Sequence, residues 1–157
     1  MSTMKITEDN RLRVVDFFQE HWGSSEMVIS SGTYVCSELD GFIFEENNRI
    51  LGLVTYVFHE KEVEVISLDS IVEGKGIGSH LMKEVERFVQ QQGISTISLV
   101  TTNDNLNALK FYQKRGYTID AVFPNAVEKA RAMKPSIPFV GNDGIPIRDE
   151  IRLVKNL

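Results

Sequence analysis

The chain has 157 residues, of which 42% are hydrophobic and 25% are charged, as in a soluble domain that buries its own core. Its formal net charge is −5 and its Lys and Arg residues form no run, which argues against nucleic acid as a partner. No stretch reaches the run of about 20 apolar residues that crosses a membrane. We therefore expect one domain over residues 1–157, with neither a membrane nor a nucleic-acid partner.

Cysteine and histidine usage indicates a reducing compartment and no metal site. Cys36 is the single cysteine, so no disulfide can form within the chain. The three histidines, His21, His59 and His80, are scattered rather than clustered as zinc ligands are. The N-terminus also lacks the apolar region of a signal peptide. We expect a cytoplasmic protein without a metal ion.

The first elements predicted are one helix and three strands. Residues 9–21 are predicted to form an amphipathic helix behind an Asp9 cap, because apolar residues recur at helical spacing, namely Leu12, Val15, Phe18 and Trp22. Short β-rich runs follow at residues 41–45, 49–58 and 62–70. Asn47-Asn48 forms a turn-like pair between the first two runs, so we predict consecutive antiparallel strands.

The pattern then changes to alternating helices and strands. A Gly-rich stretch at residues 73–78 leads into a predicted helix at 79–92 and a buried strand at 95–101. Asp104 is predicted to cap a helix that runs to about residue 115. A strand is predicted at residues 117–123, after Gly116 ends that helix.

The last segment, residues 124–148, contains all four prolines and is predicted to be a long ordered loop. A short helix is expected at residues 126–133, and a strand resumes at 147–154. Long ordered loops are often lids or binding loops. The segment is therefore a candidate acceptor site with charges available to orient a polar substrate, namely Arg131, Asp143, Arg148 and Asp149. The alternatives are a cover for the sheet and a dimer contact.

The Gly-rich turn has the composition of a phosphate-binding site. Several backbone N–H groups at the start of a helix attract an anion. A P-loop is excluded because Gly78 is followed by Ser79-His80 instead of Lys-Ser/Thr. A Rossmann turn is excluded because neither Gly74 nor Gly76 opens a GxGxxG motif. Glycines that merely connect two elements are the structural alternative.

Two segments, in the correct order and spacing, resemble the signatures of the GNAT acetyltransferase superfamily. Residues 73–78 with Leu81-Met82 resemble its acetyl-CoA signature, and residues 105–117 resemble its NxxAxxxYxxxGF/Y segment. The resemblance implies an α/β (α+β) GNAT fold, a mixed and mostly antiparallel sheet flanked by helices. Its central strands, ending near Ser70 and Thr102, would splay apart. Glu73 departs from the Arg or Gln that is usual in the family.

By resemblance, the protein is an N-acetyltransferase that moves an acetyl group from acetyl-CoA, its co-substrate, to a primary amine. Transfer would be direct, in a ternary complex. The acceptor, a small molecule or a peptide, is not identified by the sequence. The resemblance implies that these residues bind acetyl-CoA: Leu68, Asp69, Ser70, Gly74, Lys75, Gly76, Ile77, Gly78, Ser79, Asn105, Ala108 and Tyr112.

Two residues are candidates for catalysis. In the family, a tyrosine at the place of Tyr112 protonates the departing thiolate; an aromatic anchor is the structural alternative. A lysine-like amine has a pKa of about 10.4 and must lose a proton before it attacks. Glu64 occupies a strand position where several family members carry a catalytic glutamate, and a solvated strand carboxylate is the alternative. Strand alternation predicts that Glu64 shares a face with Ile66, Leu68 and Ser70.

Two other classes of function stay open at this point. One is a non-catalytic module that binds or senses acyl-CoA, which would tolerate replacement of Tyr112 and Glu64. The other is a Gly-loop protein that prefers ATP or NAD to acetyl-CoA. The sequence also leaves the oligomeric state open, with a homodimer as one alternative because dimers are frequent in the superfamily.

Overall fold

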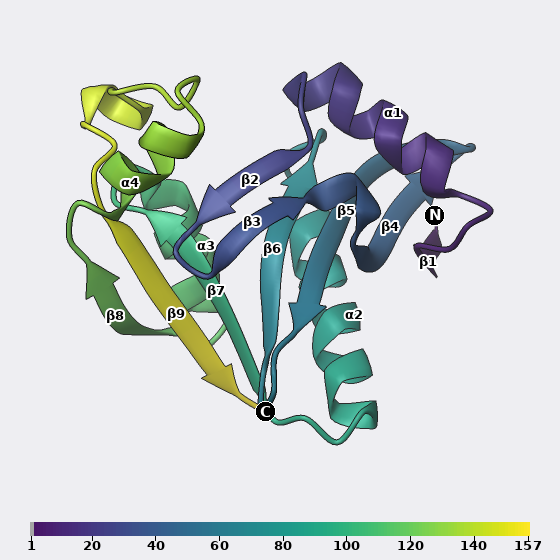
Figure 1. The fold of residues 1–157 in the computed structure, drawn as a ribbon. Helices are drawn as coiled ribbons and strands as arrows, with labels where there is room; N and C mark the ends of the chain where they lie inside the picture. The colour runs from purple at the N-terminus through teal and green to yellow at the C-terminus, as the bar shows by residue number, and fades with distance from the viewer. Residues whose placement is uncertain (1) are drawn as a thin grey trace. The chain divides into compact units, whose positions relative to one another are not determined.

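The computed structural model describes residues 2–157, which form four α-helices and nine strands (Figure 1). The architecture is α+β, with a mixed and mostly antiparallel sheet and flanking helices, as the sequence predicted. The chain packs as two compact units. Unit 1 contains the chain up to residue 27 with residues 34–97 and 157, and unit 2 contains residues 28–33 and 98–156. The single domain over residues 1–157 stays a prediction.

Unit 1 contains four antiparallel strands in the order β1-β4-β5-β6. They are β1 (Ser2–Lys5), β4 (Asp40–Glu46), β5 (Arg49–Phe58) and β6 (Val63–Ser70). The three predicted strands are therefore confirmed, and the turn between β4 and β5 contains Asn47 and Asn48, both with positive φ. The short β1 was missed, because four residues carry too little periodicity.

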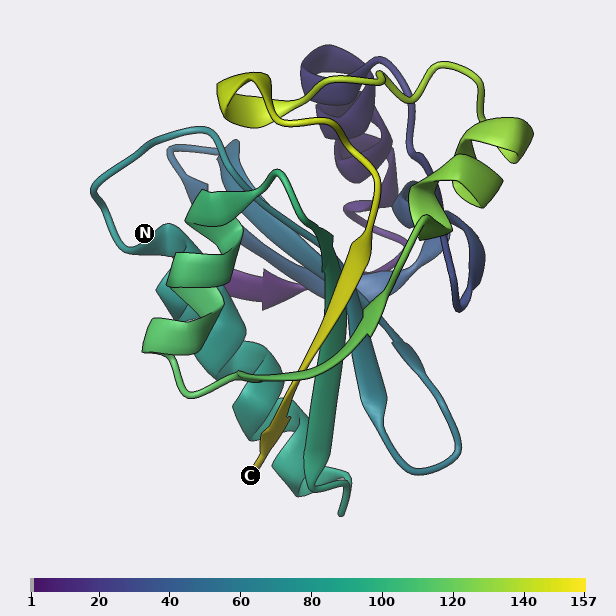
Figure 2. The ribbon, with the colours of Figure 1, turned by 90° about the vertical axis from the view of Figure 1, so that its left-hand side faces the viewer.

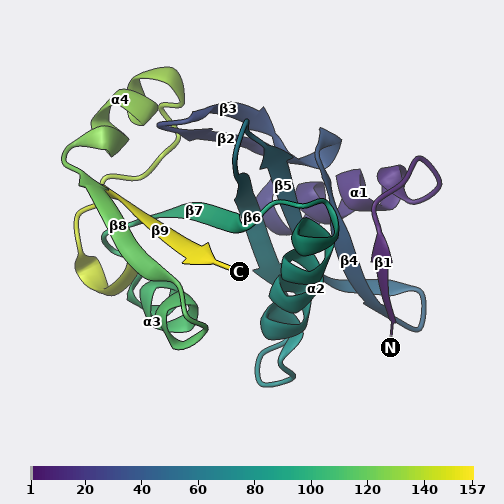
Figure 3. The ribbon, with the colours of Figure 1, turned by 90° about the horizontal axis from the view of Figure 1, so that it is seen from below.

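Helices α1 (Arg11–Trp22) and α2 (Ile77–Gln91) lie on opposite faces of β4 and β5 (Figure 3). The predicted apolar face of α1 was partly wrong. Its buried residues are Val14, Phe17 and Phe18, whereas Leu12 is 78% exposed. Clusters of adjacent apolar residues allow two helical faces, and packing against the sheet selects one.

A glycine brings α2 close to the sheet. A Cβ on Gly52 would lie 2.8 Å from Cγ2 of Ile77 and 2.6 Å from the backbone oxygen of Asp69. Only glycine leaves room for this approach. The first residue of α2 is thereby held against β5, where β5 pairs with the end of β6.

A two-stranded hairpin, β2 (Glu26–Ile29) and β3 (Gly32–Val35), was not predicted. Its strands have four residues each, and none of their residues is fully buried. Such strands lack the alternating apolar pattern on which a sequence prediction depends. A 3₁₀ turn at Cys36–Glu38 follows the hairpin.

Unit 2 contains strands in the order β7-β9-β8, with β9 drawn in yellow in Figure 2. They are β7 (Thr96–Thr102), whose residues from 98 onward belong to this unit, β8 (Thr118–Phe123) and β9 (Glu150–Asn156). Strands β8 and β9 are antiparallel. Helix α3 (Leu106–Lys114) follows β7, and α4 (Ala126–Met133) follows β8. Among residues 2–157, no helix has the length and apolarity of a membrane span.

The segment between β8 and β9 is ordered by its own polar groups. The Arg131 guanidinium donates to the carbonyl oxygens of Ile137, Pro138 and Ile147 at 2.9–3.2 Å and lies over the Phe139 ring. The Arg148 side chain donates to Asn125 Oδ1 at 2.8 Å. Arg131 therefore holds the loop rather than being available to a substrate. The Arg148 side chain is 60% exposed, so its availability to a substrate stays a prediction.

Candidate active site

The Gly-rich turn has the backbone that the sequence predicted for an anion site. Gly74 and Gly76 have φ of 78° and 68°, in the left-handed region that favours glycine. Gly76 is the N-cap of α2, and a Cβ on either glycine would meet no atom within 4 Å. The N–H groups in the first turn of a helix lack an intrahelical acceptor. The turn therefore offers open main-chain donors at the positive end of a helix dipole.

Charged side chains near this turn are exposed. Glu73 and Lys75 both lie at the surface, and Lys75 Nζ is 3.9 Å from Glu46 Oε2. An exposed ion pair of this length contributes at most about 1 kcal/mol. Lys75 can therefore turn toward a bound anion, and solvent screens the unfavourable charge of Glu73.

The end of β6 carries three of the candidate acetyl-CoA residues. Leu68 pairs with Val54 and Ser70 pairs with Gly52, while Ser70 Oγ donates to the backbone oxygen of Val72 at 2.8 Å. The same part of β5 holds the start of α2. Unit 1 therefore brings the end of β6 and the glycine turn to one end of the sheet.

Asp69, the third candidate residue at this end of β6, has a carboxyl group with a raised pKa. Its Oδ2 is buried without a hydrogen-bond partner among the described residues. Burial raises the pKa of the Asp69 carboxyl to about 7, and a hydrogen bond from the Trp22 side chain partly opposes that rise. The carboxyl is therefore partly protonated near neutral pH.

The predicted face of Glu64 was wrong because β6 contains a bulge. Thr55 pairs with Ser67, but the next residue of β5, Tyr56, pairs with Val65. Ile66 is the extra residue and has no partner in β5. Because cross-strand partners share a face, Glu64 lies on the face of Ser67 and Asp69 rather than that of Leu68 and Ser70.

Glu64 is a buried carboxylate with a defined partner. It is 2% exposed, and its Oε1 lies 2.8 Å from His59 Nε2. The His59 side chain is 39% exposed. A solvated strand carboxylate, the alternative to a catalytic one, is therefore excluded, although burial by itself does not assign Glu64 the role of base.

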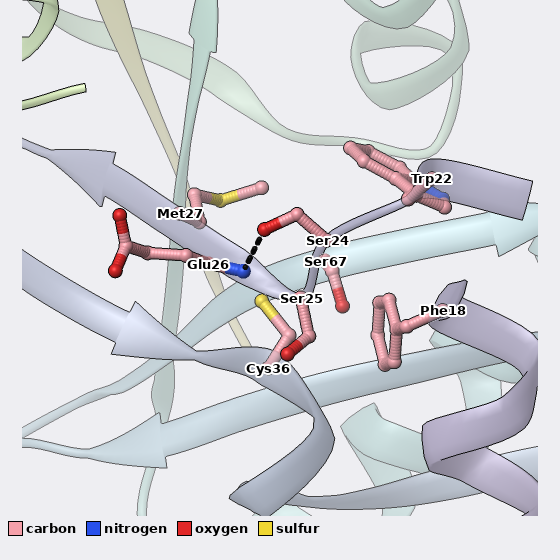
Figure 4. A pocket seen from close by; sticks show the side chains of 8 residues that line it. All are labelled: Phe18, Trp22, Ser24, Ser25, Glu26, Met27, Cys36 and Ser67. Atoms are coloured by element: carbon pink, nitrogen blue, oxygen red, sulfur yellow. Dashed lines mark hydrogen bonds between the residues drawn. The ribbon is translucent and has the colours of Figure 1, made fainter. Parts of the chain in front are cut away.

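A small cavity of about 10 Å³ in unit 1 is lined in part by Ser67, which lies on the same face of β6 as Glu64 (Figure 4). Trp22, Ser24 and the buried Cys36 are among the residues that line it. Ser24 Oγ accepts a hydrogen bond from the Glu26 N–H at 3.2 Å, marked by the dashed line. This volume accommodates about one water molecule, so the cavity is too small for an acceptor.

The remaining candidate residues lie together on α3 in unit 2. Asn105, not Asp104, is the N-cap of this helix, and its Oδ1 accepts from Ala108 N at 3.1 Å. Asp104 instead accepts from Thr102 Oγ1 and from Asn142 N, which anchors the long loop. The side-chain amide donors of Asn105 are not used in the cap, so they are the groups available to a ligand.

Tyr112 is 9% exposed and packs edge-on against Phe111 and Tyr117, with ring centroids 5.1 and 5.8 Å away. The ring is therefore fixed by neighbouring aromatics. Such packing is compatible both with an aromatic anchor and with a phenol held in one orientation for proton transfer. The assignment of Tyr112 as an acid stays a prediction.

Two features of this region were not predicted from the sequence. The bulge at Ile66 leaves no sequence signal, because an apolar residue in an apolar strand looks regular. His59 was treated as an ordinary histidine, although its position five residues before Glu64 across a short hairpin was a usable signal. No group of three or more potential metal ligands occurs within residues 2–157.

Comparison with known proteins agrees with the fold. A family model described as the acetyltransferase (GNAT) family matches residues 9–117. The uncharacterized protein YxbD of Bacillus subtilis (strain 168) is 56% identical over 142 residues, which cover 90% of this chain and 89% of that protein. The match to the family model spans more than half of the chain. The chain therefore belongs to the GNAT acetyltransferase family.

More distant relatives have the same fold or share part of the sequence. A GNAT family acetyltransferase from Elizabethkingia anophelis, solved with acetyl-CoA bound, has a TM-score of 0.71 and 18% identity, covering 99% of this chain and 97% of that one. The putative phosphinothricin acetyltransferase YwnH of Bacillus subtilis (strain 168) is 32% identical over 71 residues, 45% of this chain and 44% of that protein. The predicted GNAT resemblance is confirmed.

Proposed function

We propose that the protein is an N-acetyltransferase that transfers an acetyl group directly from acetyl-CoA to a primary amine. The observation that carries this proposal is the turn of Gly74 and Gly76, with positive φ at both glycines, at the start of α2. Membership of the family and the acetyl-CoA bound to its Elizabethkingia anophelis relative support the choice of donor.

Main-chain groups would hold most of the donor. The pyrophosphate would accept hydrogen bonds from the N–H groups of residues 74–79, where the helix dipole is positive. The pantetheine arm would contact the backbone of residues 68–70. Asn105 and Ala108 would meet the same arm from α3. Because main-chain N–H groups would make most of the contacts, acetyl-CoA binding would tolerate Glu73 in place of the Arg or Gln that is usual in the family.

The chemical step assigns one role to each candidate residue. The substrate ammonium loses a proton to Glu64, directly or through a water molecule, and the free amine attacks the thioester carbonyl. Ile66 is the bulge residue, with no partner residue in β5, and its main-chain N–H would stabilise the oxyanion. The C–S bond then breaks while the C–N bond is kept, and Tyr112 protonates the thiolate. The extra proton on the new amide nitrogen leaves to water, from which Tyr112 regains its own proton.

His59 would complete the route for the proton. A buried carboxylate that accepts a proton in each turnover must release it to solvent. His59 is hydrogen-bonded to Glu64 and half-exposed, and histidine exchanges protons readily near neutral pH. We assign His59 the role of passing the proton from Glu64 to water.

Direct transfer is favoured over a covalent acetyl-cysteine intermediate. Cys36 is only 2% exposed, and the cavity beside it has a volume of about 10 Å³. A nucleophilic thiol is normally accessible to solvent and lies in electropositive surroundings. The buried position of Cys36 supports a role as a small apolar core residue.

The test is a pair of measurements on the purified protein. Acetyl-CoA at 100 times its Kd should stabilise the fold by about 2.7 kcal/mol, and ATP or NAD should not. An amine panel with acetyl-CoA should then release free thiol. No melting shift at millimolar acetyl-CoA would refute donor binding. Binding without thiol release from any amine would support the sensing module instead.

A further inference from the structure

A second cavity, of about 330 Å³, lies within unit 2 beside α4. Its walls come from the end of β2, one side of α4 and the first residue of β9. Small-molecule sites begin at about 300 Å³, so this cavity can hold a compact organic ligand. Neither of the two arginines considered for the acceptor lines it.

The walls of the cavity are mainly apolar. Five aliphatic or thioether side chains contribute, namely Val28, Ile29, Ala126, Ala130 and Met133. Three polar residues complete the lining, namely Ser30, Lys129 and Glu150. An apolar cavity with few polar groups fixes both the body of a ligand and the orientation of its head group.

Glu150 is the most unusual of the polar residues. It is 2% exposed, and its Oε1 accepts one hydrogen bond, from the Ser30 N–H at 3.1 Å. No ion pair to this carboxylate occurs within residues 2–157. A buried carboxylate is unfavourable unless it is paired and fully hydrogen-bonded. Glu150 therefore has unused capacity to accept hydrogen bonds from a cation.

Lys129 does not neutralise this carboxylate. It is exposed on α4, where water and salt screen its charge. Glu150 is buried in a cavity whose other lining residues are mostly apolar, so its charge acts more strongly. The carboxylate of Glu150 therefore favours a positively charged group, while the apolar lining residues favour hydrocarbon.

We propose that this cavity binds a small organic ammonium with an apolar body. The ammonium donates to Glu150, and the hydrocarbon packs against Ile29, Ala130 and Met133. Assigning this ligand as the acetyl acceptor depends on the proposed function; the cation site itself does not. The acceptor class is then a compact alkylamine-like cation rather than an anionic substrate.

The experiment measures binding of n-hexylammonium to the protein without acetyl-CoA, by calorimetry at pH 7.5. Hexanol and hexanoate are the neutral and anionic probes of equal length. Hexylammonium should bind at least about tenfold more tightly than either, as expected for one charge-assisted hydrogen-bonded pair. Equal binding of hexanol, or tighter binding of hexanoate through Lys129, would overturn the proposal.

Variants test whether Glu150 binds the ammonium group. Glu150→Gln should weaken hexylammonium by at least about tenfold and leave hexanol unchanged. Glu128→Gln, an exposed α4 change outside the cavity, is the matched control. Should Glu150→Gln fail to fold, Met133→Lys adds a positive charge at a 66% exposed wall residue and should weaken hexylammonium more than it weakens hexanol. Unchanged hexylammonium affinity in a folded Glu150→Gln or Met133→Lys variant contradicts the site.

The outcomes separate this proposal from the proposed function. Hexylammonium binding without any acetyl-CoA binding would keep the cation site and refute the transferase. Thiol release with an amine whose KM is the same in Glu150→Gln and wild type would keep the transferase and refute the acceptor assignment. If Glu150→Gln raises the KM of the amine at least about tenfold and leaves the acetyl-CoA KM unchanged, both proposals are supported.

Discussion

His59 Nε2 lies 2.8 Å from Glu64 Oε1, which joins a carboxylate that is 2% exposed to a side chain that is 39% exposed. The two residues flank a short hairpin corner between β5 and β6. The contact gives the buried carboxylate a hydrogen-bonded connection to solvent. The proposed mechanism needs such a connection, because a base in a closed site must lose its proton after each turnover.

Replacement of Glu64 by Gln should lower kcat by about 10²-fold near neutral pH. Gln keeps the size of the side chain and a hydrogen bond to His59 but cannot accept the proton. The deficit should shrink as pH rises toward the amine pKa of about 10.4, because more of the amine is already neutral. Rates from pH 7 to 9.5 check this, and a defect of constant size would contradict a role as base.

Replacement of His59 by Gln should lower kcat on the order of tenfold, less than the Glu64 change, because water can partly replace a relay. The acetyl-CoA KM should not change. His21→Gln is the control, since His21 lies on α1 and its ring packs against Phe17. Equal rates for wild type and a folded His59→Gln variant would remove His59 from the proton route.

The features predicted correctly were those that a few neighbouring residues determine. Gly74 and Gly76 encode their positive φ locally, and so does the Asn47-Asn48 turn. The face of Glu64 was not predictable, because the bulge at Ile66 depends on how β5 and β6 pair. Glu150 gave no signal either, since its burial depends on residues more than 100 positions earlier in the chain.

Replacement of Tyr112 by Phe should keep acetyl-CoA affinity and lower kcat by about 10²-fold or more. The ring contacts with Phe111 and Tyr117 survive in this variant, so folding should be unaffected. Tyr117→Phe is a matched control in the same aromatic cluster. A Tyr112→Phe variant with wild-type turnover would leave Tyr112 as a packing residue only.

Replacement of Gly76 tests the glycine turn as the pyrophosphate site. Asp and Asn are nearly isosteric and both tolerate a φ of 68° better than most residues, so their difference isolates charge. Gly76→Asp should bind acetyl-CoA at least about tenfold more weakly than Gly76→Asn. Titration of both folded variants is the measurement, and equal Kd values would count against this turn.

Replacement of Asp69 by Asn should stabilise the fold in a pH-dependent way. Burial raises the pKa of Asp69 to about 7, so the folded state holds a proton that the unfolded chain releases near pH 3.8. Wild-type stability from this group is therefore fully present below pH 3.8 and is lost as pH rises through about 7. Asn cannot ionise, and it keeps an oxygen that can accept from Trp22.

The stabilisation by Asp69→Asn should therefore be larger at pH 8 than at pH 5, by on the order of 2 kcal/mol. Urea denaturation at both pH values measures it as the change in the free energy of unfolding. Asp16→Asn, at an exposed site on α1, should change the free energy of unfolding by the same small amount at both pH values. A gain for Asp69→Asn that is equal at pH 5 and pH 8 would show that the Asp69 carboxyl titrates normally. In that case the buried Oδ2 is hydrated in solution, and the strand end beside the glycine turn is more open to water than its packing indicates.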